Sequence, residues 1–234
     1  MTWAAPLETK TQGSTGTAAS QSCTLATSPV AGDFLVVLYD SYTGSGAAVA
    51  SASIADNKGG NTWTQDIWFD ENAFGSVRSI AIWSTTVVNG GSSFQVTITP
   101  NISTKGDVTI HRYGSPGGAV SRESAHANRA ATGTTLTTGS VSIATGPDLV
   151  VAIGGSDFDL STFTLTQRIH NAGGAGLFYG TEDSLNATSS VNPGFTLVSN
   201  GNWICAAAAY SYAAGGIMHF FSGETEEHLD VLTF

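Results

Sequence analysis

Short segments in which apolar and polar side chains alternate recur from one end of the chain to the other. In the segment 92–100, Phe94, Val96 and Ile98 alternate with polar residues, and the segment 161–169 repeats the pattern. Successive side chains of a β-strand point to opposite faces, so this period of two is typical of half-buried strands. Turn-forming clusters such as DNKGGN, VNGGSS and HNAGGAG stand between these segments. The pattern predicts a series of antiparallel strands.

The composition favours strands over helices. The chain has 234 residues, of which 41% are hydrophobic and only 11% are charged, and it contains 28 glycines. Exposed helix faces usually carry many Lys, Glu and Arg residues, so this low charge argues against helices. We therefore predict an all-β fold, an antiparallel two-sheet β-sandwich of the jelly-roll type.

Charge and hydropathy exclude several classes of partner. The net charge is −10, and the eight Lys and Arg residues are spread singly along the chain. Because no basic stripe is available to follow phosphates, we expect no nucleic-acid partner. The longest apolar runs, such as FLVVLY and ICAAAAY, are too short to span a bilayer, and the chain begins without a leader pattern. We expect a protein made in the cytoplasm, with no membrane partner.

An internal repeat suggests that the sandwich consists of two similar halves. The segment AGDFLVVLYDS (31–41) is similar to GPDLVVAIGGS (146–156), and both contain the continuous apolar run of a strand covered on both faces. The segment 105–114 follows the first copy at about the distance at which 200–212 follows the second. We expect one domain with a shared core, and a connector over 115–135 that forms a short helix or an outer loop.

The two ends of the chain differ from the middle. Residues 1–19 have little periodicity and are predicted to be an arm or a loosely held strand, and the sandwich is predicted over 20–213. Residues 214–234 are predicted to be a C-terminal arm that acts as an assembly element, because they are too apolar for a free tail. The arm contains Met218, and the apolar residues predicted to make the contact are Ile217, Phe220, Phe221, Leu229, Val231, Leu232 and Phe234. They could cover the chain's own sandwich, or add a strand to a neighbour.

Few residues have the spacing that catalysis or metal binding requires. The sequence contains no Gly-x-Ser-x-Gly, His-Glu-x-x-His or Cys-x-x-Cys motif. Asp157 and Asp159 could form a fragment of a cation site, and Asp66, Asp70 and Glu71 form an acidic group without a recognisable partner strand. We therefore predict a protein that is not an enzyme and has no cofactor.

The segment 52–69, ASIADNKGGNTWTQDIWF, allows two interpretations. Asp56, Asn57 and Asn61 could ligate a cation, while Trp63 and Trp68 could stack on a sugar. However, Asp and Asn side chains also bind their own backbone two residues on, and glycine supplies the positive φ of a tight turn. We favour a structural turn that joins two strands.

Two cysteines, Cys23 and Cys205, stand near opposite ends of the chain. A first and a last strand can be neighbours in a sandwich, so a disulfide is conceivable. Buried free thiols are the favoured interpretation for a chain folded in a reducing compartment.

The order of these segments resembles a group of β-sandwich domains found in phage structural proteins and in bacterial surface proteins. The resemblance rests on AGDFLVVLY, the turn ADNKGGNTWT, the strand SIAIWSTT, the hairpin VVNGGSSFQVTIT and the final GNWICAAAAYSY, and it covers about residues 20–213. It implies a fold and no catalytic residue.

The favoured hypothesis is a non-enzymatic structural protein of a phage virion: a capsid decoration, head-fibre or tail component. Its expected partners are other virion proteins and copies of itself. One alternative is an extracellular or cell-surface filament subunit that uses strand addition. Another is a carbohydrate-binding module that binds surface glycan through Trp68 or Tyr42.

Overall fold

The computed structural model describes residues 2–44, 49–71, 77–130, 132–171 and 178–213, in which sixteen β-strands form and no helix occurs. The strands of the first half are β1 (Glu8–Ala18), β2 (Gln21–Thr24), β3 (Phe34–Tyr42), β4 (Ala52–Asp56), β5 (Thr64–Glu71), β6 (Arg78–Thr86), β7 (Gln95–Pro100) and β8 (Thr104–Tyr113). Those of the second half are β9 (Val120–Ala130), β10 (Thr135–Thr137), β11 (Asp148–Ser156), β12 (Leu160–Phe163), β13 (Thr166–Asn171), β14 (Phe178–Ala187), β15 (Gly194–Leu197) and β16 (Trp203–Tyr212).

The two halves have the same topology. In the first half a five-stranded sheet, β1-β8-β3-β6-β5, accompanies a three-stranded sheet, β2-β7-β4. In the second half the corresponding sheets have the orders β9-β16-β11-β14-β13 and β10-β15-β12. Adding eight to each strand number of the first half therefore reproduces the second half, with antiparallel pairing throughout. The predicted duplication is confirmed.

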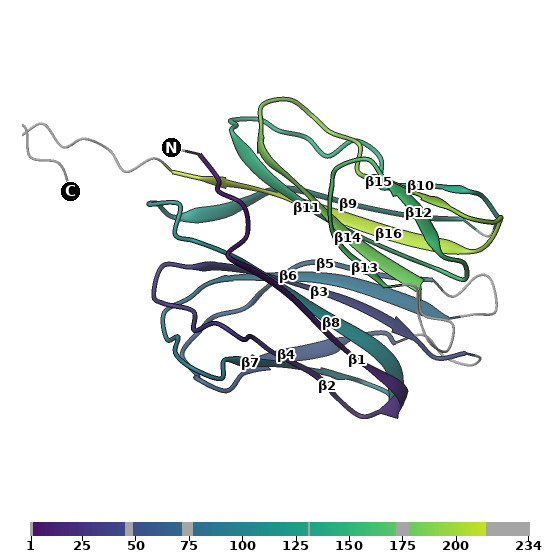
Figure 1. Ribbon diagram of the computed structural model, residues 1–234, viewed down its shortest axis with the longest axis horizontal. Helices are drawn as coiled ribbons and strands as arrows, with labels where there is room; N and C mark the ends of the chain where they lie inside the picture. The colour runs from purple at the N-terminus through teal and green to yellow at the C-terminus, as the bar shows by residue number, and fades with distance from the viewer. Residues whose placement is uncertain (1, 45–48, 72–76, 131, 172–177, 214–234) are drawn as a thin grey trace, which may run out of the picture.

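The four sheets stack in layers, with the two five-stranded sheets in the middle and the three-stranded sheets outside (Figure 1). A shared core lies between the large sheets, and each half has an outer core beneath its small sheet. Strand β3 contributes Val36 and Leu38 to the shared core and Leu35 and Val37 to the outer core. This double coverage explains why β3 and β11 are continuous apolar runs. The predicted all-β sandwich is confirmed, and it is a doubled one.

The connector 115–135 is where the sequence-based expectation was wrong. Instead of a short helix or an outer loop, Val120–Ala130 forms β9, the counterpart of β1, which pairs with β16 along its length. The sequence VSRESAHANRA is poor in β-branched and aromatic residues, so its strand propensity is weak. Pairing with β16 overrides that local preference.

The described part of the segment 1–19, predicted as an arm or a loosely held strand, is integrated into the fold. Strand β1 pairs with β8 at the edge of the large sheet. Trp3 is buried against Phe34 and Tyr113, and its backbone N–H and C=O both bind the side chain of Asn186. The start of the first half is thereby tied to the second half.

None of the elements in the described ranges is a helix long and apolar enough to cross a membrane.

Candidate functional site: the seam between the two halves

In the turn at 56–61, the side chains that might have bound a cation are hydrogen-bonded to the protein. Asp56 accepts the backbone N–H groups two and three residues on, each at 2.9 Å, and the indole N–H of Trp63, also at 2.9 Å. Asn57 and Asn61 bind backbone groups of the neighbouring 88–95 segment through both their amide oxygen and their amide nitrogen. The structural interpretation of this turn is confirmed.

The aromatic residues considered for sugar stacking are packed against protein. Trp68 is half-buried over the outer core of the first half, with its ring centroid 6.0 Å from that of Trp83. Tyr42 is half-buried too, and the guanidinium of Arg78 lies over its ring at 5.6 Å. Neither ring is a free, exposed platform of the kind that stacks on a sugar.

The acidic pair Asp157 and Asp159 does not converge on one point. Asp159 pairs with the imidazole of His170 at 2.7 Å, whereas Asp157 accepts the side-chain amide of Asn202 at 2.7 Å and lies 3.9 Å from Arg78. Across the described ranges, no three His, Cys, Asp or Glu residues cluster as metal ligands.

The two cysteines are buried free thiols, as the favoured interpretation predicted. Cys23 lies in the outer core of the first half and Cys205 in the outer core of the second. Both large sheets therefore separate them, which excludes a disulfide. Burial raises the pKa of Cys23 to about 12 and also raises the pKa of Cys205.

The C-terminal arm residues Ile217, Phe220, Phe221, Leu229, Val231, Leu232 and Phe234 lie outside the described residues. The last described residue, Ala213, donates its N–H to the carbonyl of Ala119 at 3.0 Å, just before β9. The arm therefore begins beside the edge strand of the second half.

Many of the buried polar groups of the described residues lie at the contact between the two halves. We call the contact of β1 and β8 with β13 and β14 the polar seam, and the contact of β5 and β6 with β9 and β16 the apolar seam. The repeat relates the two seams, because Tyr113 pairs with Phe34 just as Tyr210 pairs with Leu149. Strand β8 faces the second half with Asp107, Thr109, His111 and Tyr113, and the equivalent positions of β16 are Ile204, Ala206, Ala208 and Tyr210. One copy is therefore polar where the other is aliphatic.

The polar seam contains a continuous chain of hydrogen bonds. His111 contacts Thr181 through Nε2 at 2.9 Å and Tyr113 through Nδ1 at 3.2 Å. The hydroxyl of Tyr113 donates to Asp183 at 2.8 Å, and Arg168 holds the other oxygen of that carboxylate, also at 2.8 Å. Complete burial, with a smaller effect of the Arg168 charge, lowers the pKa of His111 to about 3, so the imidazole is neutral at pH 7.

One polar contact of the apolar seam is equivalent to a contact of the polar seam. The hydroxyl of Tyr210 donates to Asp66 at 2.7 Å, in the same sense as Tyr113 donates to Asp183. Asp66 sits at a β-bulge of β5, where Arg168 occupies the matching bulge of β13. Both halves therefore send one tyrosine across the contact to a carboxylate of the other.

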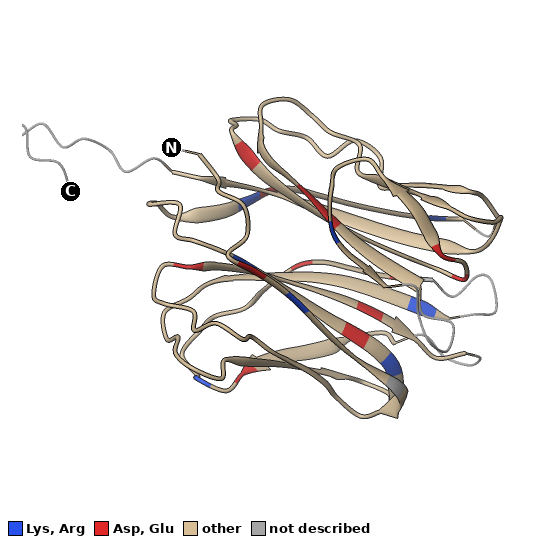
Figure 2. Ribbon diagram, viewed as in Figure 1, with Lys and Arg blue, Asp and Glu red and all other residues tan. Residues whose placement is uncertain are grey.

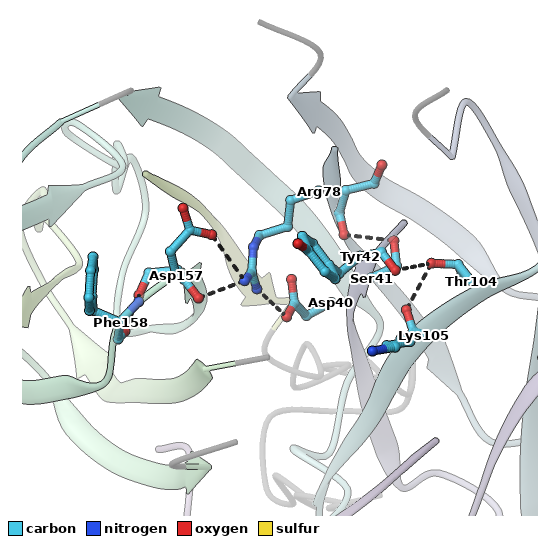
Figure 3. Close-up of polar contacts among 10 residues, drawn as sticks. Asp40, Ser41, Tyr42, Arg78, Thr104, Lys105, Asp157 and Phe158 are labelled. Atoms are coloured by element: carbon cyan, nitrogen blue, oxygen red, sulfur yellow. Dashed lines mark hydrogen bonds and ion pairs between the residues drawn. The ribbon is translucent and has the colours of Figure 1, made fainter. Parts of the chain in front are cut away.

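A buried ion pair lies between the halves where β3 crosses β11 (Figure 3). Arg78 on β6 donates to Asp40 at 2.8 Å and to the carbonyl of Ser156, in the other half, at 2.6 Å. The repeat places Gly155 at the position equivalent to Asp40, and the two face each other. A Cβ at Gly155 would lie 2.7 Å from Asp40 Oδ1, so only glycine leaves room for the pair.

The carboxyl groups at this point hold protons more tightly than usual. Burial raises the pKa of Asp40 to about 6, although the charge and hydrogen bond of Arg78 oppose the change. Asp107, its cross-strand neighbour on β8, has its pKa raised to about 7 by burial and by the charge of Asp40. These groups act on one another, and Asp40, Asp107 and Arg78 are each no more than 7% exposed.

Sequence reasoning missed these seam residues because each stands singly within an apolar or Thr-rich strand. The signal that could have found them is the repeat itself. Asp40 and His111 stand where the other copy has Gly155 and Ala208, and each has a tertiary partner that explains the difference. Figure 2 shows the same feature, with charged residues lying singly on strands of both halves rather than in one stripe.

Comparisons with known proteins place no family on this chain: no family model, no curated protein and no solved structure matches it.

Proposed function

We propose that this protein is a non-enzymatic structural component of a phage virion, a capsid decoration, head-fibre or tail protein, made in the host cytoplasm. It acts by assembling with other virion proteins and with copies of itself. The observation that carries the proposal is that the ionisable groups at the contact between the two halves bind one another instead of lining an open site. The buried pair of Arg78 and Asp40 and the network around His111 join one half to the other. Such groups stabilise a rigid block.

The assembly element is the C-terminal arm, residues 214–234. Eight large apolar side chains in so short a segment, Met218 included, need a surface to cover, because solvated tails are depleted in such residues. The segment HLDVLTF has the alternation of a strand, and strand addition requires an open sheet edge. In the described residues, β4 and β12 are hydrogen-bonded to a neighbouring strand on one side only. An arm from a neighbouring copy completes such an edge.

The alternatives receive less support. A surface-filament subunit would use the same arm in the same way, and it differs in where the assembly is found rather than in the contact. For a carbohydrate-binding module, the packing of Trp68 and Tyr42 against protein removes the two platforms the hypothesis needs.

Deletion of residues 217–234 tests the proposal. We expect the truncated protein to keep its melting temperature within a few degrees, but to lose self-association in light scattering and incorporation into particles. A full-length variant with serine at Phe220, Phe221, Leu229 and Val231 should behave like the deletion. A control with glutamine at Glu226 and Glu227 should still assemble. If truncation unfolds the monomer, or if assembly survives it, the arm is not an assembly element.

A further inference from the structure

The repeat exposes one place where the second half lacks a cation that the first half contains. In the first half, Glu8 and Asp33 lie beside the loop between β2 and β3, and Arg112 reaches them from β8. The guanidinium of Arg112 donates to Asp33 at 2.7 and 2.8 Å and to the hydroxyl of Thr27 at 2.7 Å. Although burial opposes the change, the hydrogen bonds from Thr27 and Ala26, and to a smaller extent the charge of Arg112, lower the pKa of Glu8.

The second half keeps both acids and loses the arginine. Glu123 takes the place of Glu8: it accepts the backbone N–H of Ala144 at 2.8 Å and the hydroxyl of Thr145, just as Glu8 accepts the N–H of Ala26 and the hydroxyl of Thr27. Asp148 takes the place of Asp33 at the start of the central strand.

The position of Arg112 is occupied by Ala209 in the second half. Arg112 lies one residue before Tyr113, which pairs with Phe34, and Ala209 lies one residue before Tyr210, which pairs with Leu149. Within the described part of the second half, no side chain therefore delivers a positive charge to the two carboxylates.

The loss leaves Asp148 without a donor. Asp148 is 1% exposed, and no N–H or hydroxyl group donates to either of its carboxylate oxygens, so a hydrogen bond to Glu123 forms only when Asp148 itself carries a proton. The polar group that acts on it most directly is the Glu123 carboxylate, itself an acceptor. The position that faces Asp148 on β14 is Ala187, and Ala209 on β16 pairs with the second residue after it, Val150. A buried carboxylate in this state is expensive unless a cation or a proton satisfies it.

We propose that Glu123 and Asp148 form a cation-binding site of the second half, matched to Ca²⁺, at the place that the Arg112 guanidinium fills in the first. Besides the N–H of Ala144, the polar groups that bind Glu123 are the hydroxyls of Thr145 and Ser211, so the side-chain donor atoms that the site offers a cation are all oxygens. Oxygen-only donor sets suit Ca²⁺, which accepts six to eight of them in flexible geometry, and disfavour Zn²⁺. Two carboxylates completed by hydroxyls and solvent are enough for a weak site.

Protons compete with the ion at this site. Burial raises the pKa of Asp148 to about 6, and the hydrogen bond and charge of Glu123 add to the rise. Cation binding must displace any proton held between the two carboxyl groups. The site therefore binds Ca²⁺ better at pH 8 than at pH 5.

The test uses the full-length protein with CaCl₂ at constant ionic strength. We expect millimolar Ca²⁺ to raise the melting temperature by about 3–6 °C at pH 8 and by less at pH 5, with binding visible by titration calorimetry. Asp148→Asn removes the charge and should abolish both signals. Ala209→Arg supplies the missing guanidinium from within the chain, so it should stabilise the protein without Ca²⁺ and abolish the Ca²⁺ response. Asp70→Asn removes one negative charge, as Asp148→Asn does, and should leave the response to Ca²⁺ intact.

Three outcomes overturn the proposal: no response of the native protein to Ca²⁺, a response that persists in both Asp148→Asn and Ala209→Arg, or a response equally lost in Asp70→Asn. If Asp148→Asn is more stable than the native protein at pH 8 and Ca²⁺ has no effect, the two acids share a proton instead. The readouts do not depend on assembly, so the result is independent of the proposed function.

Discussion

Replacing Arg78 with methionine is the sharpest test of how the two halves are joined. Methionine keeps most of the apolar stem of arginine but removes both the 2.8 Å contact with Asp40 and the 2.6 Å bond to the Ser156 carbonyl. Asp40 has no exposed surface, and its Oδ1 already lacks a partner. The variant therefore leaves a bare carboxylate between the sheets.

The expected loss of unfolding free energy is large because the charge of Asp40 stays buried. Breaking a buried pair by removing one partner costs about 3–5 kcal/mol of unfolding free energy. For a chain of this length, that corresponds to a melting temperature lower by roughly 6–20 °C.

The loss should also depend on pH in a definite direction. Since the folded pKa of Asp40 is about 6 and its ordinary value is 3.8, the folded state holds the proton more tightly. Stability is therefore lost as pH rises between these values. Arg78 is the group that lowers this pKa, so removing it extends the loss to higher pH. The variant should be much closer to the native protein at pH 5 than at pH 8.

Urea unfolding followed by tryptophan fluorescence, at pH 5 and pH 8, measures these differences. Adding Asp40→Asn to Arg78→Met removes the stranded charge, so the double variant should regain at least about 1 kcal/mol at pH 8. Arg129→Met is the matched control, because Arg129 also bridges the two halves but is exposed: it donates to the carbonyl of Asp70 and lies over the ring of Phe69 at 5.3 Å. Its loss should cost less than about 1 kcal/mol. A loss below about 1 kcal/mol for Arg78→Met, or an equal loss at both pH values, would refute the reasoning.

Two further sites and one pair of thiols yield smaller predictions. Asp56→Ala should lower the free energy of unfolding by about 0.5–2 kcal/mol, because three hydrogen bonds in the turn are lost; an unchanged urea midpoint would contradict this. Gly155→Ala should lower the free energy of unfolding by about 1–3 kcal/mol, because the added methyl group crowds Asp40. An unchanged free energy of unfolding would show that the contact between the halves has room for the methyl group. Cys23 and Cys205 should react with a thiol reagent only on unfolding, and rapid labelling of the native protein would argue against their burial.

Several features of this protein follow from the sequence because they are local. A period of two and the Gly-rich turns determine strands within a few residues, and DNKGGNTWT contains the acceptor, the glycines and the tryptophan of its own turn. The repeated segments 31–41 and 146–156 are continuous apolar runs because both faces of each strand are covered. That observation alone was enough to indicate two halves and a shared core.

The tertiary structure decided what depends on partners far away in the chain. Strand β9 forms because β16 offers it a ladder of hydrogen bonds, although its own residues have weak strand propensity. Period two shows that His111 and Tyr113 share a face, but not that this face meets Thr181 and Asp183. Nor does it show which duplicated positions lose a partner. Asp148 has the same local sequence context as Asp33, and it differs because position 209 on a distant strand is alanine rather than arginine. Local periodicity determines faces, whereas the charge state and bonding of a buried group depend on residues that only folding brings together.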